Sequence, residues 1–412
     1  MWKKPWGYRE GATIAAGLLL TGILLQGSVG KIDWELLSWP VNIILLLVYI
    51  IVLAMVSGLS GRIYLFRWLG SYAAAVTSLA AVVVMTVIMG LIRQTGPQTV
   101  SGVAPWLGFS QMLSAWPFAL LFTWLITVLG LTAFRHLYPF RWRNIPFLLN
   151  HLGLFVAVVA AVLGNADLQR LKMTTVVGKA EWRAYDEAGQ QSELPLAIEL
   201  QHFTIDEYPP KLMLIDNGTG KVLPEGKPEH LLLGSGEQEG QLADWRIRVV
   251  RQMAESARVA TEDTVKFVAF HSIGATYAVY IEADNRLTGV RREGWVSCGS
   301  FLFPYKALRL DEQVSLVMPE REPQRFVSDV KLYTQSGRKL EAVIEVNRPL
   351  TVEGWKVYQL SYDESKGKWS DISVFELVRD PWLPLVYIGI WMLIAGAVWI
   401  FVTASKRKEE QL

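Results

Sequence analysis

Cysteine is almost absent from this chain, because Cys298 is the only one among 412 residues. A single thiol excludes an internal disulfide framework. It also excludes the C-x-x-C motif of thiol oxidoreductases and the C-x-x-C-H motif of cytochromes that carry covalently attached haem.

Charge is missing from six long stretches, none of which contains Asp, Glu, Lys or Arg. Each approaches or exceeds the roughly 20 residues that a helix needs to cross a ~30 Å hydrocarbon core. With 51% apolar residues and 17 tryptophans, the composition excludes a soluble enzyme. We predict six transmembrane helices, within Gly11–Gly30, Leu36–Gly61, Trp68–Ile92, Trp116–Phe134, Asn144–Ala166 and Pro381–Ser405.

Basic residues in the short connecting segments predict the orientation, since cationic loops stay in the cytoplasm. Placing both termini inside leaves only Lys31 and Arg93 in the short outer loops. It collects eleven basic residues on the inner side: Lys3, Lys4, Arg9, Arg62, Arg67, Arg135, Arg141, Arg143, Lys406, Arg407 and Lys408. We therefore expect a multi-pass protein of a bacterial cytoplasmic membrane. A cleaved signal peptide is not expected, because no A-x-A-like site comes after the first apolar stretch.

This topology predicts a membrane domain at 1–166, an extracytoplasmic domain at 167–380, a last transmembrane helix at 381–405 and a cytoplasmic tail at 406–412. The long outer segment carries 33 acidic and 27 basic residues, a net charge of −6. The overall charge of +2 thus reflects the basic inner loops, and no nucleic-acid partner is expected.

The pattern of the outer segment is typical of strands. Trp245–Val250 alternates apolar and basic residues, and Val265–Phe270 and Ala275–Ile281 are rich in β-branched and aromatic residues. Asp329–Thr334 and Glu341–Val346 flank a Ser336-Gly337 turn, as the arms of a hairpin would. The expected fold class is an α-helical integral membrane protein with one large extracytoplasmic antiparallel β-rich domain, which could hold two packed sheets.

His151 is the histidine that stands out, because it lies in the uncharged stretch Asn144–Ala166. A neutral imidazole there can ligate haem iron, and its neighbours Phe147, Leu148, Leu154 and Phe155 would supply an apolar wall. The alternative is a histidine bonded to a carbonyl of a neighbouring helix or to Asn150. His136 is expected in a cytoplasmic loop with Arg135, Arg141 and Arg143, where it could meet haem propionates or simply be a solvated residue of that basic loop.

Several motifs together resemble those of the ResB-like family of cytochrome c biogenesis proteins. The segment Gly354–Asp363 resembles the pattern G-W-x-x-Y-Q-x-x-Y-D, and Phe326–Val330 resembles F-x-S-D-V. His151-Leu152-Gly153-Leu154-Phe155 stands where the family has a histidine that opens the helix before the outer domain. Five helices precede the outer domain here, where shorter family members have three.

The resemblance implies a part in System II cytochrome c maturation. It implies a CcsA-type membrane haem-handling partner, with His151 as one axial ligand of a haem b that is held transiently and shared with that partner. Apocytochrome c is the other implied partner, besides the lipid bilayer. Trp355, Tyr358 and Tyr362 are candidate contacts to apocytochrome or partner, or core residues.

The W-G-x-x-W-x-W-D motif of CcsA is absent, so the chain is expected to be its partner and need not be an enzyme by itself. Two other functions stay open at this point. One is a transporter or channel component with an extracytoplasmic sensor domain, although the six stretches lack the intramembrane charges that it predicts. The other is a membrane-tethered scaffold without haem.

Overall fold

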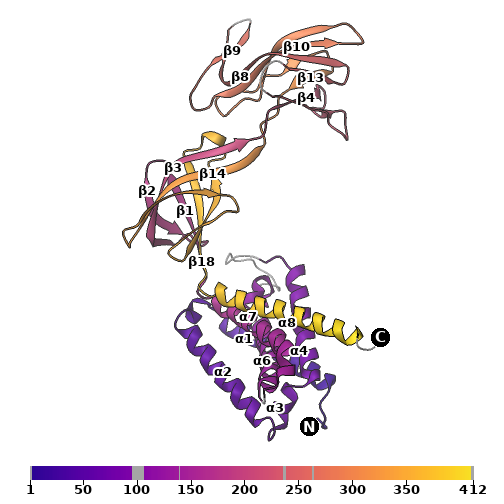
Figure 1. The fold of residues 1–412 in the computed structure, drawn as a ribbon, viewed down its shortest axis with the longest axis vertical. Coiled ribbons are helices and arrows are strands. Elements are labelled where there is room, and N and C mark those ends of the chain that lie inside the picture. The colour runs from indigo at the N-terminus through magenta and orange to yellow at the C-terminus, as the bar shows by residue number, and fades with distance from the viewer. Residues whose placement is uncertain (1, 95–105, 139, 235–237, 262–263, 410–412) are drawn as a thin grey trace. The chain divides into compact units, whose positions relative to one another are not determined.

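The computed structural model describes residues 2–94, 106–138, 140–234, 238–261 and 264–409. By contacts the chain divides into two compact units, one of residues 1–169 with 379–412 and one of residues 170–378. The first is helical and the second is built of strands (Figure 1).

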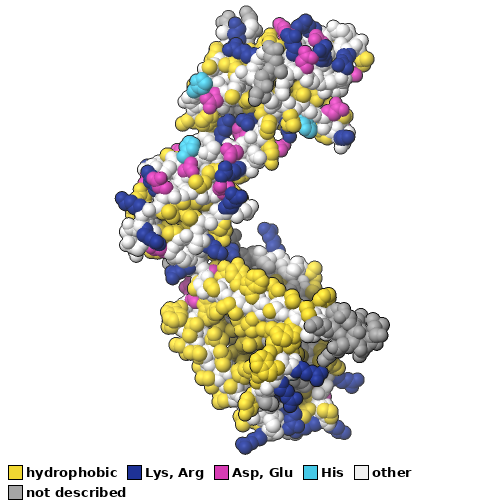
Figure 2. All heavy atoms as spheres, viewed as in Figure 1, with side chains coloured by type: hydrophobic (Ala, Val, Ile, Leu, Met, Phe, Trp, Pro, Cys, Tyr) yellow, Lys and Arg dark blue, Asp and Glu magenta, His cyan; other side chains and the backbone are white. Residues whose placement is uncertain are grey.

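Six helices of the described residues are long and apolar enough to cross a membrane. This confirms the predicted six-helix membrane protein with a large antiparallel β-rich domain. Apolar side chains cover much of the helical unit's visible surface in Figure 2, whereas charged groups are scattered over the β unit. The helices are α1 (Tyr8–Val29), α2 (Val41–Leu59), α4 (Tyr72–Leu91), α6 (Trp116–Leu137), α7 (Ile145–Gly164) and α8 (Leu383–Glu409).

Short helices occupy several of the connections. One of them, α3 (Tyr64–Leu69), was not expected from the sequence, and its end is held by Arg135 of α6. The Arg135 guanidinium donates to the carbonyls of Phe66, Arg67 and Gly70 at 2.8–3.1 Å, and so pairs the unsatisfied end of that helix. The short 3₁₀ elements are η1 (Glu35–Leu37), η2 (Phe109–Ser114), η3 (Trp142–Asn144) and, in the β unit, η4 (Gly367–Trp369).

Glycine lets α7 and α8 approach each other closely, although they are far apart in sequence. A Cβ on Gly153 would lie 2.8 Å from the Gly389 carbonyl oxygen, and one on Gly389 would lie 2.6 Å from the Gly153 carbonyl oxygen. Such small residues allow helix backbones to meet directly within a membrane. The helix that carries His151 is thereby fixed against the last helix of the chain.

One carboxylate, Asp167, ties together the starts of α2 and α8 and the end of α7. It accepts hydrogen bonds of 2.7 Å from the Trp39 backbone N–H, the Asn42 amide and the Trp382 indole. Burial by itself raises the pKa of Asp167, but these three donors outweigh it and hold the pKa below the ordinary aspartate value.

Asp167→Asn should therefore lower the free energy of unfolding of the detergent-solubilised chain at pH 7 by about 1–3 kcal/mol. The measurement is a lower thermal midpoint. A depressed folded-state pKa gives stability that is present above the unfolded-state pKa and is lost as the pH falls through the folded-state value. The difference between wild type and variant should thus shrink under acid conditions. The exposed Asp33, whose carboxylate accepts from the Glu35 backbone N–H alone within the described ranges, gives the control Asp33→Asn. An equal effect of both substitutions at pH 7 would contradict the assignment.

The β unit holds two hydrophobic cores. The first belongs to an eight-stranded sheet of order β15-β14-β3-β2-β1-β18-β17-β16. The expected Ser336-Gly337 hairpin is confirmed, since β14 and β15 pair antiparallel from Val327 with Glu345 to Tyr333 with Lys339. The strands are β1 (Gln169–Val176), β2 (Ala180–Tyr185), β3 (Gln191–Glu207), β14 (Pro323–Thr334), β15 (Lys339–Glu345), β16 (Leu350–Val352), β17 (Trp355–Tyr362) and β18 (Ile372–Arg379).

The second core is shared by two smaller sheets. In one sheet most strands pair with β4, and in the other most strands pair with β8. The three segments predicted as strands from Trp245 to Ile281 fall in β8, β9 and β10. The described strands here are β4 (Lys211–Asp216), β5 (Val222–Leu223), β6 (Leu231–Leu232), β7 (Gln238–Leu242), β8 (Trp245–Ala260), β9 (Val265–Ala269), β10 (Thr276–Asn285), β11 (Arg291–Ser297), β12 (Leu308–Arg309) and β13 (Val314–Val317).

Candidate functional site

The imidazole of His151 is oriented by its own helix. Its Nδ1 lies 3.0 Å from the carbonyl oxygen of Phe147, one turn earlier in α7. A carbonyl can only accept, so Nδ1 carries the proton and the lone pair of the neutral ring is on Nε2. Among the described residues Nε2 has no hydrogen-bond partner. This is the arrangement in which a histidine can donate Nε2 to a metal while its other nitrogen fixes the ring.

The structure brings His136 next to His151, with the ring of Phe147 between them. Ring centroids of Phe147 and His151 are 3.8 Å apart with planes inclined by 18°, and those of His136 and Phe147 are 4.0 Å apart. His136 Nδ1 lies 2.9 Å from the Thr132 carbonyl oxygen, so His136 also carries its lone pair on Nε2.

The location of His136 corrects the sequence interpretation. It lies in the last turn of α6, not in a loop after it. The helix continues to Leu137, and Arg135 within its last turn is half-buried and paired with the end of α3.

Neither form of the packing alternative for His151 occurs among the described residues. Its partner is a carbonyl of its own helix, and the side chain of Asn150 donates instead to Pro146 at 2.8 Å. Of the residues predicted to form its apolar wall, Leu148 and Phe155 are buried in the helix packing, whereas Leu154 is exposed.

The space between α6 and α7 next to the turn that carries His151 is small. An apolar cavity of about 50 Å³ lies there, lined by Gly130, Ala133, Phe134, Leu137, Leu148, Leu152 and Phe155. A cavity of about 150 Å³ is needed to hold even benzene. An imidazole with a free Nε2 suits haem iron, but a porphyrin bound to His151 would not fit in this cavity and would have to lie on the outer surface of these helices.

The three aromatic candidates of the β unit all lie on β17. Trp355 is 3% exposed and belongs to the first core. Tyr362 is half-buried and packs its ring on Phe203 at 5.1 Å, and Tyr358 is also half-buried. Core packing therefore accounts for the burial of Trp355 and for much of the burial of Tyr362.

Sequence reasoning missed a buried polar cluster made by two of the motifs. The side-chain amide oxygen Oε1 of Gln359 accepts hydrogen bonds from Ser328 at 2.7 Å and from Ser373 at 3.0 Å, and the two serine hydroxyls are 2.9 Å apart. The Ser373 carbonyl oxygen in turn accepts from Thr175 at 2.9 Å. The serine of F-x-S-D-V and the glutamine of Y-Q thus join β14 to β17 inside the core. Both Ser328 and Gln359 are polar although they occupy strand positions that face inward. This combination was the signal in the sequence that could have indicated the cluster.

These features define a multi-pass membrane protein with a β-rich domain and a histidine pair at one end of its helices. Residues 296–371 match the model of the ResB-like family, and this supports a ResB-like protein. The family implies a role in cytochrome c biogenesis and a membrane partner in that process. The match runs from the end of β11 to η4 and includes Ser328 and Gln359, but not the histidine pair. No curated protein matches the chain.

Proposed function

We propose that this protein serves System II cytochrome c maturation together with a CcsA-type membrane protein. His151 is one axial ligand of a transient haem b that the partner shares, and the β unit holds apocytochrome c for attachment. The observation that carries this proposal is the bond from His151 Nδ1 to the Phe147 carbonyl, which presents Nε2 for coordination.

The packing of α6 and α7 supports a haem shared between two chains. Since the cavity beside Leu148 and Leu152 is too small for a porphyrin, a haem bound through Nε2 would lie against the outside of the helices. A partner chain there would shield the macrocycle from lipid and supply a second axial ligand. When bound, the haem supplies the iron that Nε2 ligates and the vinyl groups that become thioethers.

His136 has a secondary part in this proposal. It stacks on the face of Phe147 opposite to His151 and is anchored through Nδ1 in the same manner. It can contact a propionate or hold Phe147, and thereby His151, in place. Depletion of haem by substitution of His136 should therefore be weaker than by substitution of His151.

An absorbance spectrum of the complex, purified with its partner, tests the proposal directly. A haem Soret band that shifts when His151 is replaced would support it. A complex that matures cytochrome c without any haem band would instead support the scaffold function.

The orientation of the chain belongs to the same proposal, with both termini in the cytoplasm and the β unit outside. Lys221 lies in the exposed turn between β4 and β5, so a cysteine there should be accessible. In a Cys298→Ser background, Lys221→Cys should react with an impermeant maleimide in intact cells, and Lys3→Cys only after permeabilisation. Reaction of Lys221→Cys only in opened cells would overturn the topology.

A further inference from the structure

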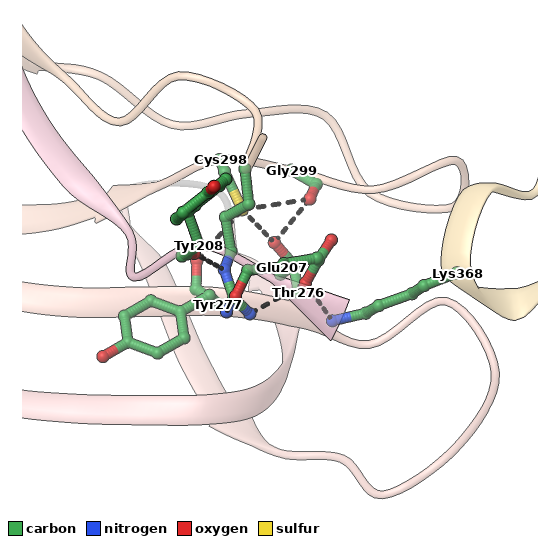
Figure 3. Close-up of polar contacts among 8 residues, drawn as sticks. Glu207, Tyr208, Thr276, Tyr277, Cys298, Gly299 and Lys368 are labelled. Carbon is green, nitrogen blue, oxygen red and sulfur yellow. Dashed lines mark hydrogen bonds and ion pairs between the residues drawn. The ribbon is translucent and has the colours of Figure 1, made fainter. Parts of the chain in front are cut away.

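A pocket of about 320 Å³ within the β unit is not used by the proposed function. Its lining comes from the end of β3, the start of β10, the turn after β11, the residues before β14 and the loop around η4. Figure 3 shows Glu207 and Lys368 meeting there, with Tyr277 and Cys298 nearby. The pocket is within the size range of small-ligand sites.

The basic residues of the pocket already have partners. The Glu207 carboxylate pairs with Arg321 at 2.8 Å and with Lys368 at 3.2 Å. Arg321 also donates to the Tyr208 carbonyl at 3.1 Å. Lys366 pairs with Asp371 at 2.6 Å, and with Asp363 at 3.9 Å. An anionic ligand would have to displace these carboxylates.

Two acidic residues of the lining, Glu320 and Glu364, have no ion pair among the described residues. The lining itself has three acidic and three basic residues, and the two aspartates that pair with Lys366, Asp363 and Asp371, lie outside it. Burial, and then the charges of Glu364 and Glu320, hold the pKa of the neighbouring Tyr362 above its usual value. Glu320 and Glu364 are therefore the two carboxylates of the lining that a bound cation could pair with without displacing a cation of the protein.

Aromatic rings complete the site. Tyr277, Phe301 and Trp369 line the pocket, and two of them already contact cations: Arg321 lies 5.9 Å from the Tyr277 ring and Lys368 5.4 Å from the Trp369 ring. Phe301 is 43% exposed, and within the described part of the chain no cation lies over its ring. Carboxylates beside aromatic faces form a favourable environment for an organic cation.

We propose that this pocket binds a guanidinium or ammonium group, presented by an arginine or lysine side chain of a polypeptide. The carboxylates of Glu320 and Glu364 neutralise the cation, and the aromatic rings contact its apolar stem and its face. This inference does not depend on haem binding by the helices.

The test uses the full chain in detergent micelles and a fluorescent peptide with one arginine, compared with the same peptide carrying neutral citrulline. The arginine peptide should bind more tightly. Glu320→Gln and Glu364→Gln should each weaken it about two- to fivefold, and together on the order of tenfold. Glu187→Gln, in the exposed turn between β2 and β3, is the matched control and should change nothing. Added salt should weaken the arginine peptide selectively.

Cys298 reports where the peptide binds, because it is the only thiol and lines the pocket. Saturating arginine peptide should slow its alkylation by iodoacetamide, and the citrulline peptide should not. Free arginine amide that binds as tightly as the peptide would assign the cation site to a small amine. Equal affinity for the two peptides, or full affinity of the double variant, would overturn the proposal.

Discussion

Replacing His151 by glycine is expected to deplete haem from the complex co-purified with the membrane partner and to stop cytochrome c maturation. Loss of a group that hydrogen-bonds to a metal ligand already lowers metal affinity or activity roughly 10–100-fold. Loss of the ligand itself should therefore lower haem affinity at least about 100-fold. Exogenous imidazole should partly restore both haem content and cytochrome yield, because it can occupy the vacated coordination position.

His151→Asn separates coordination from packing. Asn150 shows that an asparagine in α7 can donate to the carbonyl four residues earlier, so asparagine at 151 can keep the bond to Phe147 while losing Nε2. We expect this variant to fail like glycine. Asn150→Ala, which removes the adjacent intrahelical bond, is the control and should retain haem. Normal haem content and cytochrome yield in both His151 variants, at equal expression, would remove His151 from the mechanism.

Trp355→Ala should destabilise the β unit by about 3–5 kcal/mol, the range for truncating a large aromatic side chain in a core. Trp355 is 3% exposed among the residues of the first core. Its indole nitrogen has no hydrogen-bond partner in the described part of the chain, so Trp355→Phe loses only volume and should cost considerably less. Denaturant unfolding of segment 168–379, which contains both β cores and which we expect to fold alone, would measure this.

Trp182 provides the comparison, because it lies on β2 and is 46% exposed. Trp182→Ala should change the free energy of unfolding by less than about 0.5 kcal/mol. If Trp355→Ala left stability unchanged but abolished cytochrome maturation, Trp355 would be a contact to apocytochrome or partner. The same criterion applies to Tyr358 and Tyr362.

The sequence by itself determined the helical part and the fold class. An uncharged stretch such as Asn144–Ala166 is long enough to span a bilayer, and no soluble environment suits it, so composition alone predicts its helix. The hairpin of β14 and β15 is likewise predicted by a local turn between alternating strands. Local features suffice in both cases, because the hydrogen bonds of a helix or a tight hairpin join residues that are close in sequence.

Only the tertiary structure decided how the candidate residues meet. Sequence reasoning placed His136 in a loop and did not pair it with His151, whereas the packing of α6 on α7 brings both rings against Phe147. Ser328 and Gln359 are separated by a hairpin and a strand, yet they share a hydrogen bond in the first core. Which side chains face each other across two elements depends on their register and rotation, and those are fixed by close packing of the whole interior, which local patterns do not encode.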